Sequence, residues 1–592
     1  MDSPNGAHPE AACEGVLFFR ILPSQPRVGE RILISNYIAA HAGGRPRVVR
    51  MRFSGSTFLF AVLLTSFSIP ASAQVSPVGN VEDAQAPTSL PEVYRDIYHD
   101  TSAPAYTYTN ATPMDSVQRR VRPIEHRRVP GALPTEPDRL MQSSAIRNVA
   151  APIGKNFDGL SDASNGSSLL SVPSDNNIAV GATQVVETTN TAYRVINKST
   201  GATSLSRQVS SLFSGMSGLC GQGATSPNFT DPVVLYDEKA ARWFISIVAF
   251  TSDFNTGNQC IAVSSTSDAT GTYHRYAFTF GTNLFNDYPK FGVWPDAYYA
   301  SYNMFTPTAF AGAKSCAYKR SAMLAGTSAS AVCFTKTQEF SFLPSDLDGA
   351  TLPPAGEPNF FVDLFSTSTL HLFKFHVDFV TPSNSKFTGP TVITVPGFTP
   401  ACNPSFTCIP QGGTSQKLDS LGDRLMFRMP YRNFGNHESL VITHSVKTST
   451  AASAIRWYEI RSPNSTPSLF QKGTFGAGST SLWMGSIAMD KVGDIAVGFS
   501  KSSSTAHPGI GYTGRVPSEP SGTLESLATI FTGGGSQTGG NANGGDRWGD
   551  YSSLVLDPSN DCTFWYVNQY IPINGSFNFH TRLASFKFPG CN

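Results

Sequence analysis

The sequence is poor in charge and lacks the short motifs of several common enzyme families. Charged residues make up 14% of the 592 residues, well below the usual quarter, and the net charge is only +1. This balance gives no reason to expect a nucleic acid or an anionic membrane as a partner. No H-E-x-x-H, G-x-S-x-G, C-x-x-C or phosphate-binding glycine loop is present. Metalloprotease, α/β-hydrolase, thioredoxin-like and nucleotide-dependent chemistry therefore lack support.

The most prominent apolar run is too short to span a bilayer comfortably. It extends from Phe58 to Ile69, follows Met51-Arg52 and precedes an A-x-A sequence. A positive start, a short apolar core and a small-residue end are the three parts of a secretory signal. The alternative is a buried helix or an anchor. We predict a signal peptide, and hence a secreted protein, either extracellular or periplasmic.

Cysteine is scarce, and its count agrees with export. Of nine cysteines, Cys13 precedes the predicted signal, which leaves eight. An even number in an exported chain indicates a disulfide framework, although eight cysteines allow 105 pairings. The spacing favours neighbours. The predicted pairs are Cys220–Cys260, Cys316–Cys333, Cys402–Cys408 and Cys562–Cys591.

What the sequence does contain is a long-period repeat. Gly422, Gly485 and Gly549 each open a β-rich stretch and lie 63 and 64 residues apart, and Gly292 lies two such periods before Gly422. Recurrence of one supersecondary unit indicates repetitive architecture. Apolar runs around Asp, Asn, Gly and Pro turns, as in Ser486–Phe499, predict antiparallel hairpins.

We predict an all-β fold, a β-propeller of about seven four-stranded blades preceded by a disordered leader. Six or eight blades, an array of β-sandwiches and a parallel β-helix are the alternatives. We also predict that 155–160 adds an outer strand to the last blade. The expected organisation is an over-extended gene model at 1–50, the signal peptide at 51–73, a Pro-rich flexible leader at 74–163 with a short ordered piece at Glu92–His99, and the propeller at 164–592.

Four strings resemble exported bacterial β-propeller proteins that are largely uncharacterised and loosely sialidase-like. They are Pro173-Ser174-Asp175-Asn176-Asn177, Asp287-Tyr288-Pro289-Lys290-Phe291-Gly292-Val293-Trp294-Pro295-Asp296, Gln416-Lys417-Leu418-Asp419-Ser420-Leu421-Gly422-Asp423-Arg424-Leu425 and Arg547-Trp548-Gly549-Asp550-Tyr551-Ser552-Ser553. The resemblance implies the fold and export, and carries no set of catalytic residues. The chain departs from true sialidases because it has no Ser-x-Asp-x-Gly-x-x-Trp box.

The repeat markers lie where the inner strand of each blade begins, so their side chains are expected to converge at one mouth of the central channel. The candidate acid, base or nucleophile residues are Asp231, Asp287, Asp423, Glu438 and Asp550, and the candidate substrate-binding residues are Lys290, Arg424, Trp483, Arg547 and Trp548. Paired carboxylates and aromatic faces are what a glycosidase site needs. The competing interpretation is structural, because such Asp residues cap turns and such Trp residues pack between blades.

Two classes of function remain open from the sequence. One is a glycan-interacting propeller, with a glycoside hydrolase or polysaccharide lyase as its enzymatic form. The other is a non-catalytic propeller that binds a protein or is structural. We expect a monomer whose partner is an extracellular polysaccharide or glycoprotein, with no cofactor. Oxygen ligands at Asp175 and Asp546 fit a structural Ca²⁺, and Asx-turns explain them equally well.

Overall fold

The computed structural model describes residues 90–109, 118–121, 125–142, 144–148, 151–164, 169–221, 229–449, 452–541 and 544–592. The predicted gene-model extension, signal peptide and first part of the leader lie outside the described residues. Residues from Asp83 onward belong to one compact unit, and only this unit is considered below. Within the described ranges, no helix combines the length and apolar character needed to cross a bilayer.

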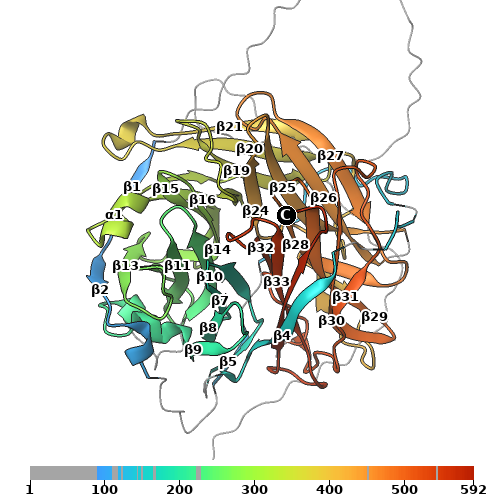
Figure 1. Cartoon of the computed structure of the whole chain (residues 1–592), viewed down its shortest axis with the longest axis horizontal. Coiled ribbons are helices and arrows are strands. Elements are labelled where there is room, and N and C mark those ends of the chain that lie inside the picture. The colour runs from blue at the N-terminus through green and yellow to red at the C-terminus, as the bar shows by residue number, and fades with distance from the viewer. Residues whose placement is uncertain are drawn as a thin grey trace, which may run out of the picture. The chain divides into compact units, whose positions relative to one another are not determined.

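The unit is built almost entirely of antiparallel sheets that follow one another in chain order (Figure 1). The first three sheets consist of β6 (Asn177–Val180), β7 (Gln184–Thr188), β8 (Ala192–Asn197) and β9 (Thr203–Gln208); β10 (Phe229–Asp237), β11 (Arg242–Phe250), β12 (Gly257–Ser264) and β13 (Tyr273–Thr279); and β14 (Phe285–Val293), β15 (Ala297–Thr306), β16 (Ala309–Lys319) and β17 (Ser330–Lys336). A short helix, α1 (Arg320–Ala325), connects β16 to β17.

An eight-stranded sheet follows, in which two four-stranded halves meet through the parallel pair β18–β24. Its strands are β18 (Leu343–Leu347), β19 (Asn359–Ser366), β20 (Thr369–His376), β21 (Lys386–Thr394), β24 (Met429–Asn433), β25 (Glu438–Lys447), β26 (Ser453–Arg461) and β27 (Ser468–Phe475). The last two sheets are β28 (Ser481–Met489), β29 (Ile495–Ser503), β30 (Ala506–Arg515) and β31 (Ala528–Phe531), then β32 (Ser553–Leu556), β33 (Thr563–Tyr570), β34 (His580–Lys587) and β4 (Ile153–Ser161). Two small pairs complete the list, β22 (Thr407–Ile409) with β23 (Leu418–Asp419) and β3 (Gln118–Val121) with β5 (Leu169–Val172).

The first strands of these units form a closed ring. Strands β6, β10, β14, β18, β24, β28 and β32 each contact the next, and β32 contacts β6. A ring of inner strands with sheets extending outward is a β-propeller, which confirms the predicted fold class. The expectation of about seven blades, made from the sequence period, remains a prediction, because counting seven units here requires dividing the eight-stranded sheet at its parallel pair.

The hydrophobic core lies between neighbouring sheets. Buried apolar side chains of adjacent units pack face to face, and the closing cluster joins Ile178 and Val180 of β6 to Val567 and Leu583 of the last sheet. Burial of about 25 cal/mol per Å² of apolar surface between each pair of blades stabilises the ring. Strand β4 pairs with β34, so an N-terminal strand completes the last sheet, as predicted for 155–160; β4 is the cyan strand at the edge of the red sheet in Figure 1.

The sequence repeat has a backbone cause. Positive φ angles between 44° and 56° occur at Asp231, Tyr288 and Met484, in the first half of the inner strands β10, β14 and β28, and at Leu421 before β24. Ladder registers shift at Asp231 and Tyr288, as expected for β-bulges, which re-aim side chains at the edge of a site. The marker Gly292 is required by close packing, because a Cβ there would lie 2.3 Å from the main-chain oxygen of Ser345.

The described part of the leader differs from the predicted flexible segment. Strand β1 (Glu92–Arg95) pairs with β17 and β2 (Tyr98–Thr101) pairs with β13, so each adds a fifth strand to a blade. This agrees with the short ordered piece expected at Glu92–His99. Further along, the main chain of Pro130 accepts a hydrogen bond from Thr367. Composition did not indicate the contact at Pro130. Main-chain hydrogen bonds of this kind do not depend on side-chain type, so a Pro-rich segment can still make them.

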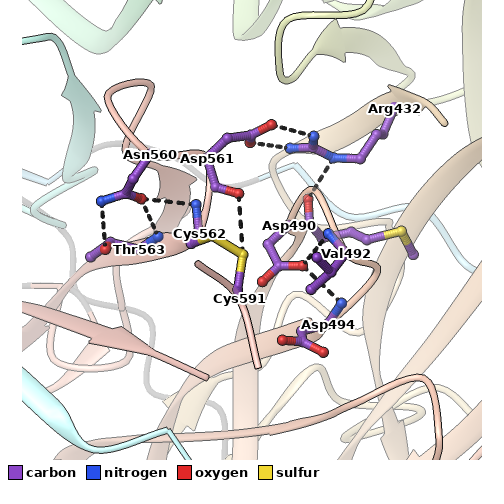
Figure 2. The surroundings of a disulfide bond; sticks show 10 residues. Arg432, Asp490, Val492, Asp494, Asn560, Asp561, Cys562, Thr563 and Cys591 are labelled. Atoms are coloured by element: carbon purple, nitrogen blue, oxygen red, sulfur yellow. Dashed lines mark hydrogen bonds and ion pairs between the residues drawn. A yellow bond between two sulfur atoms is a disulfide. The ribbon is translucent and has the colours of Figure 1, made fainter. Parts of the chain in front are cut away.

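All four predicted disulfides are present. They are Cys220–Cys260, Cys316–Cys333, Cys402–Cys408 and Cys562–Cys591. Figure 2 shows the last of them, which joins the chain end to the turn between β32 and β33. Beside it, Arg432 forms an ion pair with Asp561 at 2.6 Å, and Asp490 accepts the main-chain N–H groups of Val492 and Asp494.

Candidate functional site

Three of the predicted residues meet where the inner strands begin. Asp231, Lys290 and Asp550 come from β10, β14 and the loop before β32, and all are at least 96% buried. The Lys290 ammonium lies 2.9 Å from the ring centroid of Tyr288 and 3.9 Å from that of Tyr551. The convergence expected from the repeat is therefore observed, although the residues form a closed cluster rather than an open mouth.

The carboxylates of this cluster accept protein donors. Asp550 accepts Arg547 at 2.8 Å, and its own N–H donates to Asp175 Oδ1 at 2.8 Å. Asp231 Oδ1 accepts the Thr230 hydroxyl at 2.8 Å. Since hydrogen bonds of this kind hold a carboxylate in place without exposing it, the arrangement matches the structural interpretation. Asp175 is bonded by protein groups too, which agrees with an Asx role, and the Ca²⁺ expectation remains a prediction.

Burial controls the protonation of Lys290. Removal from water lowers the pKa of its ammonium well below the ordinary value, while the negative charges of Asp231 and Asp550 act in the opposite direction. A lysine with a depressed pKa can serve as a base. Here the amine is 1% exposed and held between two tyrosine rings, so no path for a large substrate reaches it in this structure.

Asp423 and Arg424 form a second buried pair near the first cluster. Arg424 Nε donates to Asp423 Oδ1 at 2.8 Å, and the Arg424 guanidinium lies 4.9 Å from the centroid of Tyr288. Residues of the leader close over this pair: the N–H of Arg127 donates to Asp423 Oδ2 at 2.8 Å, and His126 Nδ1 lies 3.4 Å from the same oxygen. Burial raises the pKa of Asp423, but Arg424 and His126 outweigh it and hold that pKa far below normal.

The two predicted tryptophans are core residues in this structure. Trp483 and Trp548 are 0% and 1% exposed, and their ring centroids are 5.6 Å apart. Trp548 Nε1 donates to the Ser500 hydroxyl at 2.9 Å. Neither ring presents a face to a ligand, so both follow the inter-blade packing interpretation.

Glu438 lies apart from the other four acids. It opens β25 beyond the end of β24, whereas Asp423 lies before the start of β24. Its carboxylate accepts the Tyr431 hydroxyl and faces Glu357. Burial and the neighbouring charge of Glu438 raise the pKa of Glu357 to about 7. The structure thus forms a carboxyl pair, with a partner that sequence spacing did not indicate.

Asp287 is a candidate acid that borders an open pocket of about 290 Å³. The pocket lies between the β11–β12 loop and the β15–β16 turn. Its walls carry four phenylalanines and three acids: Phe254, Phe285, Phe305, Phe310, Glu125, Asp253 and Asp287. The walls do not include Asp231, Asp423 or Asp550. Three of the phenylalanines are half-buried, so apolar ring surface and carboxylates are accessible together.

This pocket could not be predicted from a local sequence pattern. Phe254 and Phe310 lie in or beside turns more than fifty residues apart, and no local period connects them. Only closure of β11–β12 and β15–β16 in adjacent blades brings them together. Phe254 has φ of 59°, an uncommon conformation for a bulky residue, which positions its ring toward Phe285 with centroids 6.1 Å apart.

Comparison with known proteins adds the following. No protein-family model and no curated protein matches this chain. Among solved structures, it is similar to the WD40 domain of SCAP from fission yeast, with 10% identity over 69% of this chain and 82% of that chain and a TM-score of 0.31. It is also similar to an endo-arabinase from Bacteroides thetaiotaomicron (12% identity, 47% and 92% covered, TM-score 0.26) and to an exo-β-1,3-galactanase from Phanerochaete chrysosporium (8%, 70% and 94%, 0.26). Likenesses this remote carry no information on activity.

Proposed function

We propose that this protein is an exported β-propeller that binds extracellular glycan in the pocket beside Asp287. The observation that carries the proposal is the lining of that pocket, where phenylalanine rings and carboxylates share one accessible surface. Sugar rings present C–H faces that pack on aromatic rings, and their hydroxyls donate to carboxylates. A concave, largely apolar site with a few polar groups is typical of small-ligand binding.

The burial of Asp231, Asp423 and Asp550, the axial acids, favours binding over hydrolysis. A retaining or inverting glycosidase needs two carboxyl groups about 5–10 Å apart on either side of an open site. Asp231, Asp423 and Asp550 are all at least 96% buried and accept hydrogen bonds from protein groups. A sialidase-like activity therefore has no support in the geometry of these residues.

Export is proposed on independent grounds. Four disulfides persist in oxidising compartments and are uncommon in the cytosol. Together with the signal-like segment at 51–73, they favour a secreted protein that meets polysaccharide or glycoprotein outside the cell. We also propose that the protein acts as a monomer, which its molar mass in solution would test.

The test is retention of the full chain on a panel of immobilised polysaccharides, followed by titration with the best one. Phe254→Ala should weaken binding about 10-fold or more, equivalent to about 1.4 kcal/mol for one lost ring contact. The matched control is Phe470→Ala, because Phe470 is 50% exposed and lies outside this pocket. Equal losses in both variants, or retention on no polysaccharide, would favour the alternative of a protein-binding or structural propeller.

A further inference from the structure

A cluster of three ionisable side chains in the fourth blade takes no part in the proposed glycan pocket. Glu339 precedes β18, Asp363 lies in β19 and His371 lies in β20. Asp363 and His371 are direct cross-strand partners, so their side chains share one face of the β19–β20 hairpin. One ligand-type atom from each of the three residues lies within 4.8 Å of the other two.

The cluster is buried and incompletely bonded. Glu339, Asp363 and His371 are 5%, 0% and 8% exposed. His371 Nδ1 lies 3.1 Å from Glu339 Oε1, and Asp363 Oδ2 accepts the N–H of Phe340 at 3.3 Å. Asp363 Oδ1 has no hydrogen-bond partner within the part of the chain that the structure describes. A buried carboxylate oxygen without a donor is costly unless something else occupies its lone pairs.

The position of Asp363 beside Glu339 makes this cost larger. Two carboxyl groups that share a buried site repel each other when both are ionised. Arg127 lies close enough to act electrostatically on both acids, but its guanidinium donates hydrogen bonds to the main-chain oxygens of Gln338, Leu364 and Phe365. Among the described residues, no lysine or arginine side chain therefore makes an ion pair with Glu339 or Asp363, and His371 is the basic group in direct contact.

We propose that Glu339, Asp363 and His371 form a binding site for a divalent transition-metal cation of the Zn²⁺ type. An imidazole nitrogen with two carboxylate oxygens is a donor set that suits Zn²⁺, whereas Ca²⁺ and Mg²⁺ favour oxygen ligands alone. The His371 ring stacks on Phe365 with centroids 3.8 Å apart and an angle of 12°, which fixes the direction of its nitrogens.

A cation here has a structural consequence for the leader. Residues next to the site, Gln338 on one side and Leu364 and Phe365 on the other, supply the carbonyls that hold Arg127. The metal would fasten the 338–341 segment to the β19–β20 hairpin and so hold these carbonyls in place. Its role is to stiffen a docking point, and it contacts no residue of the glycan pocket.

The test uses the full chain, stripped with EDTA, dialysed and then titrated with Zn²⁺. We expect one equivalent of zinc by elemental analysis and a rise in Tm on saturation, because a ligand that binds only the folded state stabilises it. His371→Gln and Asp363→Asn should each weaken zinc binding by about 10-fold or more. The matched control is His376→Gln, which lies on the same strand with its side chain exposed and should bind zinc like the unaltered chain.

Unchanged zinc affinity in both cluster variants, or no stoichiometric zinc in the unaltered chain, would overturn the proposal. If a variant shows no cooperative thermal transition, the site is tested instead by loading the unaltered chain with Co²⁺. Visible absorption bands from bound Co²⁺ that disappear on addition of Zn²⁺ are then the expected result, and their absence contradicts the site. Glycan retention is measured in parallel, so loss of zinc without loss of retention separates this site from the glycan pocket.

Discussion

Asp423 shows how a residue that resembles a catalytic acid is held as a structural one. It is 1% exposed and accepts hydrogen bonds from Arg424 and from the leader. In an open active site the same carboxylate would need a free oxygen for substrate. Here its charge is balanced by Arg424 and His126, and both neighbours depend on it in turn. Its function at the residue scale is therefore to hold the buried Arg424 and the partly buried His126 in place.

We expect Asp423→Asn to destabilise the protein by about 3–5 kcal/mol at pH 7, because it leaves Arg424 buried without a counter-charge. The folded-state pKa of Asp423 is depressed, so its contribution is complete above the unfolded pKa of about 4, is already smaller at pH 3, and is lost only as the pH falls through the folded pKa. Chemical denaturation at pH 7 and at pH 3 measures both values. Equal destabilisation at the two pH values would contradict the assigned charge.

The leader segment at 125–132 behaves as an element of the fold. His126 Nε2 donates to Asp419 at 2.9 Å, and its ring stacks on Phe406 with centroids 4.1 Å apart. Burial lowers the pKa of His126, but the hydrogen bonds to Asp419 and Asp423 outweigh burial and raise it to about 9. Because the folded pKa is raised, the stabilisation is complete below pH 6.5 and is lost as pH rises through 9.

Hydrogen exchange of this segment should therefore rise between pH 7 and pH 10 by more than the intrinsic pH dependence of exchange predicts. The upper limit of the effect is about 3 kcal/mol, from about 1.36 kcal/mol for each unit of pKa change. His126→Gln should exchange faster at pH 7 and show no such additional rise. A segment whose protection is the same in both proteins at every pH would show that His126 does not hold it.

The closing strand β4 supplies a prediction with a matched pair of glycines. A Cβ at Gly159 would lie 2.1 Å from the Thr581 hydroxyl, whereas one at Gly154 in the same strand would lie 3.2 Å from the Ser585 hydroxyl. Gly159→Ala should cost about 1–3 kcal/mol through overpacking, and Gly154→Ala less than about 0.5 kcal/mol. Denaturant midpoints compare the two. Equal midpoints would mean that β4 does not determine the stability of the ring.

At the scale of elements, the features that could be predicted from sequence are those with a local cause. The turns and alternating strands of 486–499 and 553–570 predicted hairpins that the structure contains, and the cysteine spacing predicted the disulfides. Three features made by contacts between distant segments were not predicted. The Phe254 pocket, the Glu357–Glu438 pair and the docking of His126 each join parts of the chain with no shared pattern.

At the scale of the whole molecule, ring closure explains why a repeat identified the fold but not the site. Every blade must bring an inner strand to the axis, so the markers recur and their acids converge. Convergence at a packed axis buries those acids, as Asp231 and Asp550 show. The accessible surface lies instead between neighbouring blades, where the loops differ and Phe254 and Phe310 meet. The loops that differ between blades, rather than the repeated positions, therefore provide the surface where a ligand can bind.

The most direct test of a glycan-binding rather than glycan-cleaving propeller is to measure retention and product release together. The full chain is incubated with each polysaccharide that retains it, and released oligosaccharide is quantified beside an Asp231→Asn variant. We predict retention without release, and no difference between the two proteins in products. Released oligosaccharide that disappears in Asp231→Asn, in a variant that still folds and is still retained, would contradict the account and make the axial acids catalytic.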